Sequence, residues 1–78
     1  MLKPISIKKR AFIGANSILL PGTSIGENVI VGSGSIVKGN IPDNVVIAGN
    51  PARIIKTVKE YYEKIAQSEF EGIQIKGL

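Results

Sequence analysis

The groups available for acid–base or metal chemistry are few in this 78-residue chain. It holds ten lysines and arginines and six aspartates and glutamates, but no histidine and no cysteine. Without an imidazole or a thiol, the chain offers no side chain that ordinarily titrates near neutral pH, no cysteine nucleophile and none of the nitrogen and sulfur ligands that zinc prefers. We therefore predict neither a catalytic residue nor a metal site among these residues.

The charged residues are unevenly distributed. Residues 1–56 carry seven basic and two acidic side chains, a net charge of +5, whereas residues 57–78 carry three basic and four acidic ones, a net charge of −1. A basic half can attract a phosphorylated ligand, although most such lysines simply form a solvated surface. The run Lys8–Arg10 is short and has no aromatic neighbour beyond Phe12, so it does not indicate a nucleic-acid surface.

The length allows one small domain, which is marginal as an isolated monomer. The first residues lack the apolar core of a secretory signal, and no stretch approaches the roughly 18 apolar residues of a membrane span. We therefore expect a cytoplasmic protein without a membrane partner.

A six-residue repeat must position the side chains of the first half. Every sixth residue from position 7 to position 37 is a branched aliphatic: Ile7, Ile13, Leu19, Ile25, Val31 and Val37. The residues two places before the last five are short: Ala11, Ser17, Thr23, Val29 and Ser35. The interspersed glycines exclude an amphipathic helix, and a period of six does not match simple strand alternation.

Short strands joined by tight corners fit this period. All six repeated aliphatic side chains should point into one core, and glycines together with Asn16, Asn28 and Asn40 should adopt the corner conformations. Three hexads make one triangular coil, so residues 7–42 predict about two coils.

The pattern changes at Thr57, where a helix is predicted. Thr57 and Glu60 have the spacing of a capping box, and the following apolar residues recur at helical spacing. The helix should run over Val58–Ser68, and residues 73–78 could form a short strand or a tail. We thus divide the chain into residues 1–56 and residues 57–78. The predicted apolar face of the helix consists of Val58, Tyr61, Tyr62 and Ile65.

The run IGANSILLPGTSIGENVIVGSGSIV, followed by IPDNVVIAGNPARIIK, closely resembles the C-terminal part of the hexapeptide-repeat O- and N-acetyltransferases. This group includes the maltose, galactoside, capsular-sugar and serine acetyltransferases, and the resemblance covers residues 3–56. It implies an all-β fold, a left-handed parallel β-helix followed by a C-terminal α-helix, assembled as a homotrimer. The implied reaction transfers an acetyl group from acetyl-CoA to a sugar hydroxyl or an amine.

The resemblance also implies residues that contact the coenzyme. Small residues at the coil corners would line the path of the CoA arm, and basic residues after the NPA segment would face its phosphates. Relatives commonly have Thr-Lys-Asp where this chain has Lys38, Gly39 and Asn40. The general base of the family is a histidine on an upstream coil, and no residue here matches it. The six implied coenzyme contacts are Ala15, Gly32, Ser33, Lys38, Arg53 and Lys56.

Two functions remain open at this point. The chain could be the coenzyme-side part of an acetyl-CoA-dependent acyltransferase. Alternatively, it could be a non-catalytic β-helix assembly module, either a degenerate reading frame or the C-terminal domain of a sugar nucleotidyltransferase. The two differ in whether CoA binds near Arg53 and Lys56. A γ-type carbonic anhydrase is excluded because its zinc requires histidines.

Overall fold

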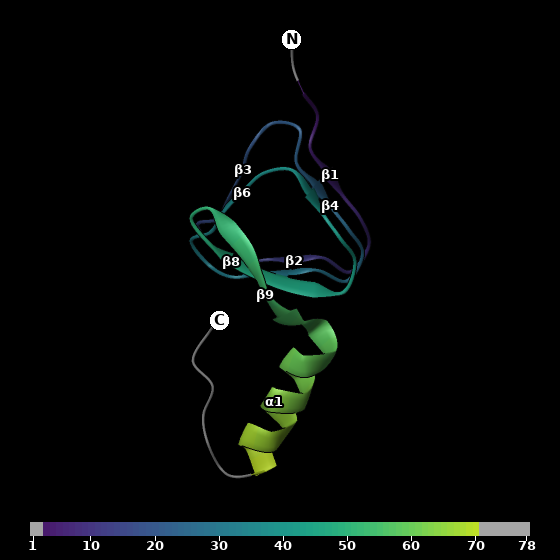
Figure 1. The fold of residues 1–78 in the computed structure, drawn as a ribbon, viewed down its shortest axis with the longest axis vertical. Coiled ribbons are helices and arrows are strands. Elements are labelled where there is room, and N and C mark those ends of the chain that lie inside the picture. Colours follow the sequence, from purple (N-terminus) through teal and green to yellow (C-terminus); the bar gives the residue numbers. More distant parts are fainter. Residues whose placement is uncertain (1–2, 71–78) are drawn as a thin grey trace.

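The computed structural model describes residues 3–70, with side chains for residues 3–66. Short strands wind around a triangular prism, and one helix leads away from it (Figure 1). The elements are β1 (Ser6–Ile7), β2 (Phe12–Ile13), β3 (Ile18–Leu19), β4 (Ser24–Ile25), β5 (Ile30–Val31), β6 (Ile36–Val37), β7 (Asn40–Ile41), β8 (Val45–Gly49), β9 (Ala52–Thr57) and α1 (Val58–Phe70).

Each side of the prism is a small sheet whose coil strands are parallel. The sheets have the orders β1-β4-β7, β2-β5-β8-β9 and β3-β6. Between the first two coils, every residue pairs with the residue 18 positions later, as in Ser6 with Ser24 and Phe12 with Ile30. Three hexads therefore make one coil, as the sequence predicts.

The third coil is shorter and incomplete. Ser24 pairs with Asn40, and Ile30 pairs with Val46, which are steps of only 16 residues. The missing two residues come from the corner between β6 and β7, which consists of Lys38 and Gly39. After β8, the chain turns back, and β9 closes the sheet as an antiparallel strand. The predicted two coils are confirmed, and β7 and β8 add part of a third.

The inward rows of aliphatic side chains form the core. Ile25, Val31 and Val37 are buried, and Ile13 and Leu19 pack against them while half-buried. Ile7 pairs with Ile25 in the same inward row, but it is 50% exposed because no described coil covers its side of the prism. The inward rows continue beyond the sequence repeat with Ile41 and Ile47, which follow Ile25 and Val31 in register.

The short residues near the corners are buried as expected. Thr23 and Ser35 are almost completely inaccessible to solvent. The Thr23 hydroxyl lies 3.1 Å from the Val37 carbonyl, and the Ser35 hydroxyl donates to the Gly32 carbonyl at 2.6 Å. Both hydroxyls therefore find hydrogen-bond partners within the wall, which is the condition for burying a polar group at low cost.

Left-handed backbone conformations mark the corners. Asn16 and Asn28 have φ values of 61° and 57°, which confirms two of the three predicted asparagine corners. The prediction for Asn40 is wrong, because the shortened corner places it in β7 and Gly39 takes the positive φ instead. The same conformation occurs at Arg10 and Asn44.

The start of α1 is the predicted capping box. The Glu60 backbone N–H donates to Thr57 Oγ1 at 3.1 Å, and the Thr57 backbone N–H donates to Glu60 Oε1 at 3.0 Å. The Thr57 N–H bond is the main cause of a lowered pKa for the Glu60 carboxyl, with further lowering from the Thr57 hydroxyl. The helix reaches Phe70, two residues beyond the predicted end, and the predicted tail at 73–78 lies outside the described residues.

α1 anchors to the outer face of the β2-β5-β8-β9 sheet through its first turns. Val58 is buried against Ile30 and Val46, and Tyr61 packs on the same cluster. Tyr62, also predicted for the packed face, is instead 56% exposed. Beyond this contact the helix runs away from the prism (Figure 1).

Candidate functional site

One corner of the prism collects three of the six implied coenzyme contacts. Ala15 follows β2, and Gly32 and Ser33 follow β5, one coil later at the same corner. The Gly34 backbone N–H donates to the Ala15 carbonyl at 2.9 Å, and the Ser17 hydroxyl donates to the Gly32 carbonyl at 3.1 Å. These bonds fix the two coils against each other and hold the corner backbone in place.

The corner is tightly packed inside and bare outside. A Cβ added at Gly14 would lie 2.6 Å from the Ser33 backbone nitrogen, so the coils approach closely only because this residue is glycine. By contrast, a Cβ added at Gly34 would meet nothing within 4 Å, and Ala15 and Ser33 are exposed. A thin ligand could therefore reach the backbone along this corner.

A β-bulge aligns the two basic residues of β9. Arg53 pairs with Ala48, and Lys56 pairs with Val46, while Ile55 is the extra residue that has no partner in β8. Residues three apart lie on opposite faces of a regular strand. Because their partners Ala48 and Val46 are two residues apart, Arg53 and Lys56 lie on the same face, with backbones about 7 Å apart.

This shared face is the outer one. Val46 points outward into the cluster beneath α1, so Lys56 lies beside the start of the helix and is half-buried. Arg53 is exposed and lies toward the other end of β9, beside the strand end at Gly49. The Gly49 N–H donates to Ser35 Oγ at 3.2 Å, which ties this end of β8 to the segment that follows the corner at Gly32 and Ser33.

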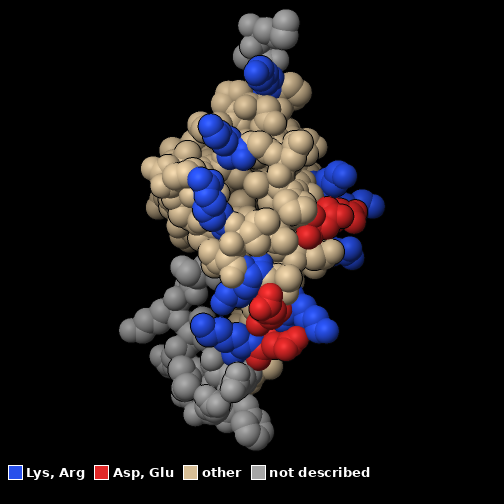
Figure 2. Space-filling model, viewed as in Figure 1, with Lys and Arg blue, Asp and Glu red and all other residues tan. Residues whose placement is uncertain are grey.

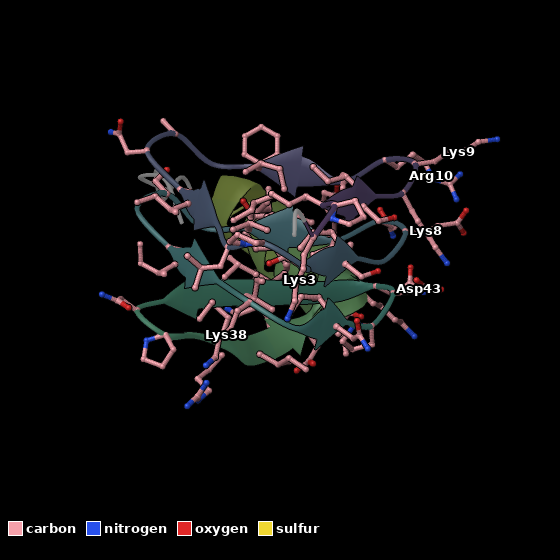
Figure 3. All side chains as sticks on the ribbon, turned by 90° about the horizontal axis from the view of Figure 1, so that it is seen from above. Lys3, Lys8, Lys9, Arg10, Lys38 and Asp43 are labelled. Atoms are coloured by element: carbon pink, nitrogen blue, oxygen red, sulfur yellow. The ribbon has the colours of Figure 1, made fainter. Side chains whose placement is uncertain are left out.

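The remaining implied contact lies elsewhere. Lys38 occupies the shortened corner between β6 and β7, one side of the prism away from Ser33. In Figure 3, Lys38 lies apart from Asp43 and the run Lys8–Arg10, which gather at one side of the view. The structure thus brings together Ala15, Gly32 and Ser33, places Arg53 two strands away from Gly32 in the same sheet with Lys56 on the same face, and separates Lys38 from them.

Two further features concern what the described residues can bind. A groove of about 520 Å³ lies between the start of α1 and the corner at Asn28 and Asn44, and none of the six implied residues lines it. Within residues 3–70, no group of three or more acidic residues could hold a metal ion. No helix in this part of the chain is long and apolar enough to cross a membrane.

Acidic and basic side chains are distributed differently over the surface. In Figure 2, the visible acidic side chains gather at one edge of the prism and on the first part of α1, whereas basic side chains spread more widely over the prism. No acidic residue lies at the prism edge that carries Ala15 and Ser33, since Glu27 and Asp43 follow β4 and β7 at another edge. An anionic ligand would meet little repulsion there.

Comparison with known proteins decides the family. The model of the bacterial transferase hexapeptide, with six repeats, matches residues 4–39. Residues 4–39 thus belong to the hexapeptide-repeat family. The fold is accordingly the left-handed parallel β-helix, followed by a C-terminal helix.

Individual members of the family show how much of a whole enzyme these residues represent. The galactoside O-acetyltransferase of Escherichia coli K12 is 45% identical over 65 residues, which cover 78% of this chain and 32% of that protein. The dTDP-3-amino-3,6-dideoxy-α-D-galactopyranose 3-N-acetyltransferase of Aneurinibacillus thermoaerophilus is 54% identical over 48 residues, with coverages of 62% and 25%. The chain therefore spans about a quarter to a third of these relatives.

Solved structures of acetyltransferases match the chain over a similar share of their own length. A galactoside acetyltransferase in complex with coenzyme A superposes with a TM-score of 0.73 at 41% identity, covering 78% of this chain and 30% of that one. A maltose O-acetyltransferase from Clostridium difficile 630 gives a TM-score of 0.69 at 45% identity, with coverages of 70% and 29%.

The bulge is the feature of the site that sequence reasoning missed. The segment Ala52–Thr57 contains no glycine or proline that would mark a bulge. The adjacent isoleucines Ile54 and Ile55 interrupt strand alternation, and this interruption is the only local signal.

Proposed function

We propose that this chain is the coenzyme-side, C-terminal part of an acetyl-CoA-dependent acetyltransferase acting on a sugar hydroxyl or amine. The observation that carries the proposal is the common face of Arg53 and Lys56 next to the bare corner at Ala15 and Ser33. A guanidinium and an ammonium on one face suit the phosphates of CoA, and the exposed corner backbone suits its narrow arm. The sugar acceptor is suggested by the galactoside and maltose enzymes to which the chain is similar.

The residues present fit the binding of CoA better than the chemistry of transfer. Bound acetyl-CoA would supply an activated thioester, and Arg53, Lys56 and the corner backbone would hold and orient its CoA portion. No histidine exists in the chain to take a proton from the acceptor. The general base would therefore come from upstream coils of a longer protein. We also propose a cytoplasmic location, where a CoA thioester is available.

We further propose a homotrimer that assembles through the β3-β6 side of the prism. The outward residues differ between the sides: Ser6, Ser24 and Asn40 on one, but Ile18 and Ile36 on the β3-β6 side. Ile18 is 53% exposed, and Phe12, which belongs to the adjoining β2-β5-β8-β9 side, is also exposed. Exposed aliphatic side chains on one flat sheet are typical of an interface. The corner at Ala15 and Ser33 borders this side, so a neighbouring subunit would flank the coenzyme.

Replacing Ile18 with Asp should shift the trimer toward monomer. The substitution places a charge in an apolar contact that recurs at each interface of the trimer. Sedimentation equilibrium at micromolar concentration measures the effect, and Ser6→Asp, at the equivalent outward position of the polar side, is the matched control. A wild-type chain that sediments as a folded monomer would contradict the proposed assembly.

Calorimetry with CoA tests the coenzyme site. The wild-type chain should bind weakly, and binding should weaken as salt rises because the phosphate contacts are partly electrostatic. Arg53→Glu should reduce the affinity about tenfold or more, since a carboxylate would face the phosphates. Lys64→Glu, an identical charge change on an exposed part of α1, is the control and should have little effect.

A second function is favoured by the same apolar surface. If the chain forms a trimer but shows no CoA binding at millimolar concentration, the β-helix would serve as an assembly module without a ligand. The exposed Ile18 and Phe12 would then be the functional residues, and Arg53 and Lys56 would be solvated surface charges.

A further inference from the structure

We propose that the groove between α1 and the corner at Asn28 and Asn44 binds a pyranose sugar. The groove has a volume of about 520 Å³ and is widely open to solvent, so it could seat one sugar ring without enclosing it. Its walls combine an aromatic ring, two valine side chains and a short row of amide and carboxylate groups. This combination matches a sugar, which has an apolar C–H face and a rim of hydroxyls.

The apolar wall centres on Tyr62. Its side chain is 56% exposed although it lines the groove, so the ring is open to a ligand. Tyr61 packs on the buried cluster beneath α1, and its ring centroid lies 5.7 Å from that of Tyr62. Tyr61 therefore supports the neighbouring ring from the protein side. Val45 and Val58 supply the rest of the apolar lining.

The polar wall consists of side chains that are already fixed. Asn28 Nδ2 donates to Asn44 Oδ1 at 2.9 Å, a bond that uses one polar atom of each amide. The side-chain oxygen Oδ1 of Asn28 and the side-chain nitrogen Nδ2 of Asn44 are left for a ligand. Asp43 Oδ1 accepts from the Glu27 N–H at 2.8 Å, which leaves Oδ2 as a further acceptor.

The mixture of groups selects between kinds of ligand. Two acceptors beside one amide donor suit hydroxyls, because a hydroxyl both donates and accepts hydrogen bonds. A phosphate or carboxylate would meet the Asp43 carboxylate in the same wall, although Lys59 also lines the groove. A purely apolar occupant would cover the remaining polar atoms of Asn28, Asn44 and Asp43 without bonding to them. Figure 3 shows Asp43 at the edge of the prism, on the same side as the run Lys8–Arg10.

The groove is separate from the proposed coenzyme corner. Val45, which lines the groove, and Gly49, which bonds to Ser35 just after that corner, are the two ends of β8, about 13 Å apart. Sugar binding here does not depend on acetyl transfer. Only the role of this site rests on the proposed function. The site would hold one sugar unit of a longer acceptor, at a distance from the hydroxyl that is acetylated.

Titration of the wild-type chain with free D-galactose and maltose, followed by NMR of the tyrosine rings, tests the proposal. Saturable shifts of the Tyr62 signals are expected at millimolar sugar. Tyr62→Ala should raise the dissociation constant about tenfold, whereas Tyr62→Phe, which keeps the ring, should retain binding. Ile5→Ala removes an exposed apolar side chain outside the groove and should leave sugar binding unchanged.

The outcomes separate this site from the coenzyme site. Tyr62→Ala should keep the CoA affinity of the wild type, so that loss of sugar binding alone supports a second site even if CoA does not bind. Equal sugar affinity in Tyr62→Ala and the wild type would overturn the proposal. So would shifts of the Tyr62 signals that follow protein concentration but not sugar, since these would mark a contact between copies of the chain.

Discussion

Ile25→Asp should abolish cooperative folding of the chain. Ile25 is completely buried in the centre of the prism, between Ile7 of the first coil and Ile41 of the third. The substitution loses about 1.5–3 kcal/mol of burial and adds several kcal/mol for an unpaired carboxylate in an apolar core. Together these approach or exceed the roughly 5 kcal/mol expected for a small domain. Circular dichroism during thermal and urea unfolding measures the loss.

The matched control for this experiment is Ile7→Asp. Ile7 belongs to the same inward row, but it is half-exposed at the uncovered side of the first coil. A carboxylate there can remain in water, so the variant should keep a cooperative transition. A sigmoidal melt for Ile25→Asp close to that of the wild type would be incompatible with the described core.

The chain alone should give no detectable acetyl transfer. General-base catalysis typically contributes 10²–10⁴-fold in rate, and the chain has no histidine for that role. An unactivated sugar hydroxyl would therefore react too slowly to register. A thiol-release assay with acetyl-CoA and a panel of sugars measures the rate, with the full-length galactoside O-acetyltransferase of Escherichia coli as the positive control. Release well above spontaneous hydrolysis would mean that another residue replaces the histidine.

The fold was predictable to the extent that it depends on the repeat. A period of six with an aliphatic residue at a fixed place determines both the strand spacing and the inward row, and Ile25 and Val31 are buried accordingly. The failures begin where the period ends. The corner at Lys38 and Gly39 is two residues short, so the sequence pattern could not reveal that Ile41 and Ile47 extend the core or that Asn40 lies in a strand.

The site was predictable only as a set of residue types. Resemblance indicated Arg53 and Lys56 as basic residues near a phosphate, but their common face depends on the unpaired Ile55. Such a bulge arises from how β9 fits the end of β8, which is a tertiary property and not a local preference. The groove beside Tyr62 likewise exists only because α1 leaves the prism next to Asn44, whose carbonyl accepts the Val58 N–H at 3.0 Å.

The shortened corner shows which changes of length this architecture tolerates. From Leu19 to Ile25 the chain takes six residues, but from Val37 to Ile41 it takes four, and both segments return an aliphatic side chain to the interior. The strands after the short corner keep their register with the coil before, since Ile25 pairs with Ile41 and Val31 pairs with Ile47. A corner can therefore lose two residues without moving a core position, and such changes of length can reshape the surface of the prism while the core remains in register.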